Sequence, residues 1–157
     1  MEVDAATAGP GDVADIGALA EAAAEELTPH RGGEMWRRRE ARPGPHAEAI
    51  ASMLDDPARH AVIAGRIDGV VVGYAIASVE PLHDGETVAD LTDLYVLPEG
   101  RGVGVGEAMM IAVTEWAGSV GCIGIDSIAL PGDRETKNFF ESFGLVARAL
   151  RVHRSIS

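Results

Sequence analysis

The sequence has very little cysteine and no long apolar run. Cys122 is the only thiol among 157 residues, so the chain cannot form an internal disulfide, and a reducing cytoplasmic setting is expected. No stretch approaches the roughly 20 apolar residues of a membrane-spanning helix, and the amino-terminal segment lacks the basic and apolar regions of a signal peptide. We therefore expect a soluble protein without membrane contact.

Positive charge is also scarce. The chain carries 13 Lys and Arg against 25 Asp and Glu, for a formal net charge of -12. Such a field repels nucleic-acid phosphates and favours the approach of cations, so nucleic-acid binding is not expected. The five histidines show no paired ligand spacing, and no cysteine cluster joins them. No metal site is expected either.

Internal repeats, low-complexity blocks and linkers are absent from the sequence. A chain of 157 residues can bury one hydrophobic core without disulfides or a structural metal. We therefore expect a single domain over residues 1–157.

Hydrophobic spacing and turn residues predict a mixed α/β sheet in the order βααβββαβαβ. Segment 31–45 between the first two helices is left open as helix edge or loop. The expected elements are a strand near Val3, a helix capped by Asp12 and running to Leu27, a helix over 46–54, a hairpin over 60–80 turning at Asp68-Gly69, a strand over 87–97, a helix over 104–119, a strand over 122–130, a helix over 133–143 stopped by Gly144, and a closing strand over 145–156.

The strand over 87–97 breaks strict alternation. Leu91 and Tyr95 share one parity, while Leu94 and Val96 share the other with polar Asp90. A β-bulge, which inserts one residue and exchanges the two faces, reconciles the two halves. We expect a bulge near Leu94.

The segment "VLPEGRGVGVGEAMM", residues 96–110, places glycines between this strand and a helix. It fails as a dinucleotide fingerprint because Glu107 occupies the third glycine position, and as a Walker loop because the only lysine is Lys137. Backbone amides at a helix start still favour an anion such as a pyrophosphate, with Arg101 adding a charge-assisted bond. Glycines that merely permit a tight turn and close packing remain the alternative.

In this context the sequence resembles the GNAT superfamily of acyl-CoA-dependent N-acyltransferases. Arg101, Gly104 and Gly106 match that family's pyrophosphate motif after an "LYV-x-P" strand, and "PGDRETKNFFESFGL" is similar to its second motif. The resemblance implies a mostly antiparallel sheet that is splayed at a pantetheine cleft. It covers residues 60–156 as the CoA-binding core and leaves residues 1–59 as the variable, acceptor-side region. Trp36 in that region is a candidate border of the acceptor site, or simply a surface helix edge.

The resemblance also implies an activity, the transfer of an acetyl group from acetyl-CoA to a small-molecule or peptide amine. A homodimer is possible. The residues expected to bind the donor lie in two regions, the bulged strand with its glycine turn and the second motif. They are Leu94, Tyr95, Val96, Arg101, Gly102, Val103, Gly104, Val105, Gly106, Asp133 and Phe140.

Asp90 stands where some family members carry a general-base glutamate, six residues before Val96. A carboxylate there could take the proton of an ammonium acceptor through a water, or Asp90 could be a solvated strand residue. Asp93 is a second candidate. Phe140 replaces a tyrosine that commonly protonates the thiolate, and a phenyl ring has no proton to give. A non-catalytic acyl-CoA-binding or regulatory module is therefore the alternative.

Overall fold

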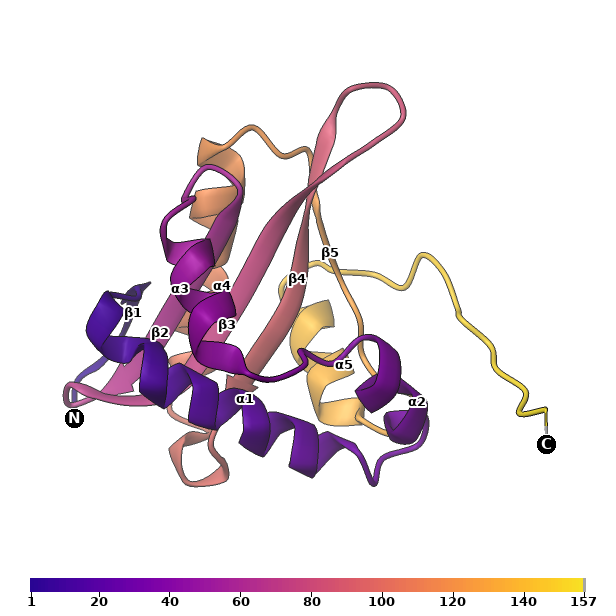
Figure 1. Cartoon of the computed structure of the whole chain (residues 1–157), viewed down its shortest axis with the longest axis horizontal. Coiled ribbons are helices and arrows are strands. Elements are labelled where there is room, and N and C mark those ends of the chain that lie inside the picture. Colours follow the sequence, from indigo (N-terminus) through magenta and orange to yellow (C-terminus); the bar gives the residue numbers. More distant parts are fainter. Residues whose placement is uncertain (157) are drawn as a thin grey trace.

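The computed structural model describes residues 1–156, whose centre is a five-stranded sheet in the order β1-β2-β3-β4-β5 (Figure 1). All neighbouring strands are antiparallel except β4 and β5, which are parallel. This confirms the predicted mixed, mostly antiparallel α/β fold. The strands are β1 (Val3–Thr7), β2 (His60–Ile67), β3 (Val70–Pro81), β4 (Thr87–Val96) and β5 (Ile125–Ser127).

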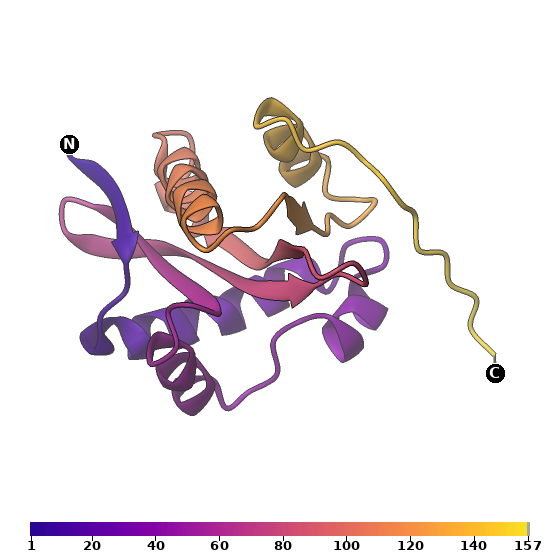
Figure 2. The same ribbon diagram turned by 90° about the horizontal axis from the view of Figure 1, so that it is seen from above.

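Helices cover both faces of the sheet (Figure 2). One face carries α1 (Val13–Leu27), α2 (Gly33–Arg39) and α3 (His46–Leu54), and the other carries α4 (Val105–Ser119) and α5 (Arg134–Ser142). Short 3-10 turns, η1 (Pro10–Asp12) and η2 (Pro98–Gly100), precede α1 and follow β4. The segment that the sequence left open contains α2.

Alternation along the central strands divides the core in two. Val62 and Ala64 of β2 pack with Ile16 of α1, whereas Ala61 and Ile63 pack with Met109 of α4. A strand that is buried on both faces needs apolar residues at successive positions, which explains the continuous apolar run of β2.

The predicted hairpin is confirmed. Asp68 and Gly69 have φ values of 48° and 81°, and Ile67 pairs with Val70 across the turn. Positive φ at both turn residues is what a two-residue type I′ turn requires, and Asp-Gly supplies it with little strain.

The predicted bulge is confirmed and lies at Thr92. Across β3, Asp93 pairs with Ile76 and Leu91 with Ala77, which leaves Thr92 without an opposite residue. Leu91 consequently packs in the core beside α4, while Tyr95 packs in the core beside α1. The extra residue therefore moves the side chains that follow it to the other face.

Three local predictions are wrong. Residues 145–156 form no strand, and the strand predicted over 122–130 is limited to β5. An alternating sequence forms a strand only where a neighbouring strand accepts its backbone hydrogen bonds, and β5 offers only three residues for such pairing. Asp12 does not cap α1 with its side chain. Instead, its Oδ2 accepts hydrogen bonds from the Gly9 amide and from Arg66 of β2, and these bonds lower the pKa of Asp12.

Candidate functional site

The sheet opens between β4 and β5. The parallel ladder joins only Ala89, Asp90 and Leu91 to residues 125–127, and β4 then continues to Val96. Ser127 marks the end of the ladder, since its Oγ donates to the Leu91 carbonyl at 2.7 Å. Over residues 92–96, β4 is paired with β3 alone within the described part of the chain.

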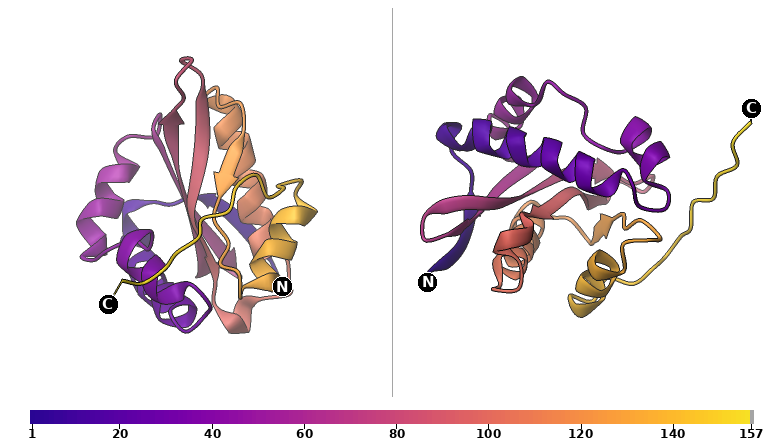
Figure 3. Two further views of the ribbon diagram at one scale, coloured as in Figure 1. Left: turned by 90° about the vertical axis from the view of Figure 1, so that its right-hand side faces the viewer. Right: turned by 90° about the horizontal axis from the view of Figure 1, so that it is seen from below.

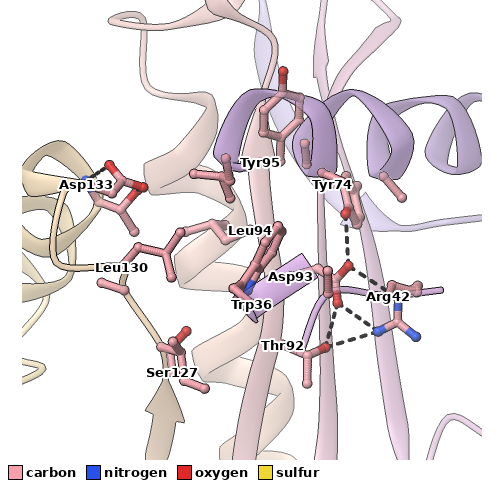
Figure 4. Close-up of a pocket in the computed structure, with 18 of the residues that line it drawn as sticks. Trp36, Arg42, Tyr74, Thr92, Asp93, Leu94, Tyr95, Ser127, Leu130 and Asp133 are labelled. Carbon is pink, nitrogen blue, oxygen red and sulfur yellow. Dashed lines mark hydrogen bonds and ion pairs between the residues drawn. The ribbon is translucent and has the colours of Figure 1, made fainter. Parts of the chain in front are cut away.

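A cavity of about 70 Å³ lies at this opening (Figure 4). Because no strand separates the two helical layers here, the cavity is bordered by α1 and α2 from one face and by α5 from the other. Its main lining residues are Ala20, Ala24, Leu27, Trp36, Arg42, Tyr74, Thr92, Asp93, Leu94, Tyr95, Ser127, Ile128, Leu130, Asp133, Thr136 and Phe140.

Asp93 is the centre of a polar network on the cavity wall. Arg42 donates to both of its oxygens, from Nη2 to Oδ1 at 2.7 Å and from Nε to Oδ2 at 3.2 Å. The Tyr74 hydroxyl donates to Oδ2 at 2.8 Å, and the Thr92 hydroxyl donates to Oδ1 at 2.6 Å. The Asp93 side chain is only 8% exposed, so these bonds replace the water that a buried carboxylate would otherwise need.

Tyr74 is fixed in this network as a donor. Its residue is 2% exposed, and burial together with the neighbouring charge of Asp93 raises the pKa of its hydroxyl. The phenol therefore stays protonated at every physiological pH.

The glycine turn lies directly beyond the open end of β4. Gly102 and Gly104 have φ values of 81° and 99°, a region that residues with a Cβ rarely adopt, and α4 begins after Gly104. A Cβ at either glycine would meet no heavy atom within 4 Å. Backbone conformation, rather than crowding, requires glycine at these two positions.

This turn fits a pyrophosphate cradle. The first amides of α4 have no partner within the helix, and they point outward at the positive end of its dipole. Gly106 differs from the other two glycines, because a Cβ there would lie 3.4 Å from the Phe139 ring. The absence of a side chain at position 106 therefore also lets α4 pack closely on α5.

The guanidinium of Arg101 is already engaged within the chain. Its Nε donates to the Val96 carbonyl at 2.8 Å, and its Nη2 donates to both carboxylate oxygens of Glu26 on α1, at 3.0 and 2.8 Å. The same Glu26 accepts from the Tyr95 hydroxyl at 3.1 Å, and the Arg101 guanidinium lies 5.5 Å from the centre of the Tyr95 ring. Arg101 therefore ties the end of β4 to α1.

The second motif, residues 131–145, contains the whole of α5. Asp133 caps the helix by accepting from the Thr136 amide at 3.2 Å and from its hydroxyl at 2.7 Å. Phe140 is buried and lines the cavity, while Phe139 and Phe143 are half-buried in the core beside α4.

The structure brings four of the expected donor-binding residues together at the cavity, Leu94, Tyr95, Asp133 and Phe140. Val96, Arg101 and the turn from Gly102 to Gly106 follow along the chain, outside the lining. These residues thus form a continuous path from the cavity to the start of α4.

Asp90 lies on β4 before the bulge and outside the cavity lining. It is half-buried and pairs with Asp126 of β5 in the parallel ladder. Burial, followed by the negative charges of Glu80, Asp126 and Asp93, raises the pKa of Asp90. A carboxylate with a raised pKa is a stronger base, which is the property that the candidate role needs.

Three polar residues at the site, Arg42, Tyr74 and Glu26, could not be identified from the sequence. Arg42 belongs to the arginine-rich segment after Trp36, and nothing in the local sequence distinguishes it from the other arginines there. Tyr74 and Glu26 lie within an apolar strand and an acidic helix, and only their positions in space connect them with the site.

No set of three His, Cys, Asp or Glu residues within 1–156 is arranged to hold a metal ion. The same residues contain no helix that is both long and apolar enough to cross a bilayer.

A family model described as the acetyltransferase (GNAT) family matches residues 19–145. A search of curated proteins found no sequence that matches this chain. Among solved structures, the fold is similar to three that each cover the chain almost completely and are themselves covered completely.

The first is AAC(6')-Iy in complex with the bisubstrate analogue CoA-S-monomethyl-acetylneamine, with 21% identity, a TM-score of 0.74 and 100% coverage of both chains. The second is ribosomal-protein-alanine N-acetyltransferase from Brucella melitensis biovar Abortus 2308, with 18% identity, a TM-score of 0.71 and coverage of 99% and 100%. The third is glucosamine-6-phosphate N-acetyltransferase from Arabidopsis thaliana, with 14% identity, a TM-score of 0.69 and 100% coverage of both chains. At these identities the similarity concerns the fold.

Proposed function

The chain belongs to the GNAT acetyltransferase family, and on that premise we propose that it transfers an acetyl group from acetyl-CoA to an amine. The observation that carries the proposal is the continuity of three features: the open end of β4, the cavity beside it, and the glycine turn that starts α4. A long thioester donor needs this combination, because its diphosphate and its reacting end lie far apart.

The residues of the path have distinct roles in the proposal. Amides from Gly102 to Gly106 hold the diphosphate at the start of α4, with Arg101 at its edge. Backbone groups of Leu94, Tyr95 and Val96 hold the pantetheine arm where β4 has lost its second neighbour. Asp133 and Phe140 form the wall contributed by α5. Acetyl-CoA supplies the activated acetyl group when bound.

The acceptor amine requires a base, because an ammonium with a pKa near 10 is not nucleophilic at neutral pH. Asp90 is our candidate. Its raised pKa suits proton transfer, and because Asp90 is not among the residues that line the cavity, we propose transfer through a water. Asp93 is less suited to this step, since Arg42, Tyr74 and Thr92 already donate to its oxygens.

We place the acceptor against α1, α2 and the segment that holds Arg42, on the side of the cavity opposite α5. The net charge of -12 attracts cationic amines to the whole surface, which favours encounter without selecting one acceptor.

Calorimetry and a thiol-release assay test the proposal in two steps. Acetyl-CoA is expected to bind with a Kd in the micromolar range, and release of free CoA is expected with at least one amine of a panel. Neamine, a peptide with an amino-terminal alanine and glucosamine-6-phosphate are suitable acceptors, because proteins of similar fold are named for related compounds. Absence of acetyl-CoA binding at high micromolar concentration would overturn the proposal.

One observation favours a second function, an acyl-CoA-binding or regulatory module without turnover. Phe140, where the family commonly has a tyrosine, faces the cavity and offers no proton to a departing thiolate. This alternative predicts acetyl-CoA binding with no thiol release from any amine. Thiol release that disappears in Asp90→Asn would exclude it.

A further inference from the structure

Every hydroxyl side chain that lines the cavity already donates its proton within the chain. These bonds, 2.6–3.1 Å long, join Tyr74 and Thr92 to Asp93, Tyr95 to Glu26, Ser127 to the Leu91 carbonyl and Thr136 to Asp133. A hydroxyl has only one proton to donate. None of these groups can therefore donate to an oxygen of an acceptor molecule without losing a bond that it already makes.

Arg42 and Asp93, on the side of the cavity opposite α5, are occupied as well (Figure 4). Asp93 accepts four hydrogen bonds, two from Arg42 and one each from Tyr74 and Thr92, and a carboxylate offers about four acceptor sites. Arg42 directs its remaining nitrogen, Nη1, toward the sulfur of Met53, 4.0 Å away in the core beside α1. This ion pair therefore has no free bond to offer to a polar acceptor.

The remaining lining on this side is apolar or aromatic. Helix α1 contributes Ala20, Ala24 and Leu27, and the two alanines are buried. Trp36 of α2 is half-buried, and its ring extends toward β4 (Figure 4). An indole ring packs on apolar groups, and its face also attracts an ammonium ion. These residues suit an amine whose charged end and apolar body lie against the same ring.

Contact between two loops limits the space at the cavity. A Cβ at Gly32, before α2, would lie 3.6 Å from Pro131, and one at Gly132, before α5, would lie 3.1 Å from the amide nitrogen of Arg31. The turn between α1 and α2 therefore touches the loop between β5 and α5 (Figure 3). A cavity of about 70 Å³ has room for about five water molecules, so it admits the amine end of a slender molecule.

On the premise of the proposed acetyl transfer, we propose that the acceptor is a primary amine on an apolar or aromatic body, selected by Trp36. Hydroxyl-rich amines such as amino sugars are poor substrates. A hydroxyl brought against this lining gives up its bonds to water and finds no side chain that is free to donate to it. One hydroxyl without a partner lowers the specificity constant about 100-fold.

Trp36 is tested with phenethylamine as the acceptor. Trp36→Ala is expected to raise the KM for phenethylamine about tenfold without changing the Kd for acetyl-CoA, because the ring lies on the acceptor side. Trp36→Phe keeps an aromatic face and should stay within about threefold of wild type. Trp116→Phe is the matched control, since Trp116 lies on α4 outside the cavity lining and its Nε1 donates to the Pro57 carbonyl at 2.9 Å. An unchanged KM in Trp36→Ala would overturn the role of Trp36, and unfolding curves establish that all variants are folded.

The acceptor class is tested on the wild-type protein with hexylamine and glucamine, which has the same carbon chain with a hydroxyl on every carbon beyond the amine-bearing one. Thiol release is measured at equal concentrations of the neutral amine, because the two amines differ in pKa. We expect kcat/KM for hexylamine to exceed that for glucamine at least 100-fold. A ratio below about tenfold, or turnover of neamine without turnover of hexylamine, would overturn this acceptor class and leave acetyl transfer standing. If no amine releases thiol, the proposed function fails and the acceptor class fails with it.

Discussion

The Nη2 atom of Arg101 donates to both carboxylate oxygens of Glu26, which lies 75 positions earlier on α1, at 3.0 and 2.8 Å. This ion pair joins α1 to the arginine that begins the glycine turn. If Arg101 also serves the diphosphate, binding of the donor and the position of α1 are coupled through one side chain.

Substitution of the two partners separates these roles. Arg101→Ala is expected to weaken acetyl-CoA binding about tenfold, the effect of losing one charge-assisted hydrogen bond. Glu26→Gln keeps the arginine and frees it from its charged partner, so its Kd should stay within about threefold of wild type. Calorimetry measures both constants. An equal loss of affinity in the two variants would mean that the pair only holds the end of β4 in place.

The glycine turn predicts a contrast between two Gly→Ala substitutions. Gly104→Ala forces a residue with a Cβ into φ 99° and is expected to destabilise the fold by about 1–2 kcal/mol and to weaken acetyl-CoA binding. Gly118→Ala lies in α4 with open space around the new Cβ, and should stabilise the fold by about 0.5–1 kcal/mol without changing the Kd. Urea unfolding and calorimetry provide the two measurements. Equal effects at both sites would remove the argument from positive φ.

Turnover should depend on Asp90. We expect Asp90→Asn to lower kcat by about 10²-fold or more at neutral pH while leaving the acetyl-CoA Kd unchanged, because the amide cannot accept the ammonium proton. Asp93→Asn serves as a comparison and should chiefly reduce stability, since it disrupts bonds from Arg42 and Tyr74. Full turnover in Asp90→Asn would assign the base to another residue.

The raised pKa of Asp90 also predicts how stability changes with pH. Between 3.8 and the raised folded-state pKa, the folded protein holds a proton at Asp90 that the unfolded chain has released, so the contribution of Asp90 to stability falls as pH rises through that window. The unfolding free energy of wild type minus that of Asp90→Asn should therefore decrease with rising pH.

Asp12 provides a control of opposite sign, because its pKa is lowered in the fold by the Gly9 amide and by Arg66. Its contribution to stability is present above pH 3.8 and is lost as pH falls through the lowered folded-state pKa. The difference between wild type and Asp12→Asn should accordingly rise with pH over that lower window. Urea unfolding at a series of pH values gives both curves, and parallel curves would contradict the assignment.

Phe140→Tyr tests the missing acid directly. Phe140 lines the cavity, so a phenol at this position would offer a proton where the donor is expected, and we predict an increase in kcat of several-fold. Phe143→Tyr is the control on the same helix; Phe143 is not among the residues that line the cavity, and no increase is expected. Single-turnover kinetics separates this step from product release. Equal rates in both variants would show that the phenol at position 140 does not reach the thiolate.

Local chemistry made much of the fold predictable. Asp68-Gly69 suits a type I′ turn through its own φ preferences, and the change of apolar parity between Leu91 and Leu94 predicted a bulge because side chains alternate strictly in a strand. The tight turn at Gly102 and Gly104 was predictable for the same reason, because glycine favours backbone conformations that other residues rarely adopt. In each case the signal lies within a few residues of the feature that it predicts.

Contacts between residues far apart in the sequence could not be predicted from such local signals. The bonds of Tyr74 and Arg42 to Asp93 join residues 19 and 51 positions apart, and Glu26 meets Arg101 only because α1 crosses the end of β4. Residues 145–156 give the clearest contrast, since their sequence favours a strand but they pair with no strand among residues 1–156. The sequence by itself determined the two turns, at Asp68-Gly69 and at the glycines before α4, and the bulge in β4, because backbone preference and side-chain alternation are local properties. The tertiary structure alone decided which charges meet at the cavity and that residues 145–156 find no partner strand in the described part of the chain, because each depends on where the chain returns in space.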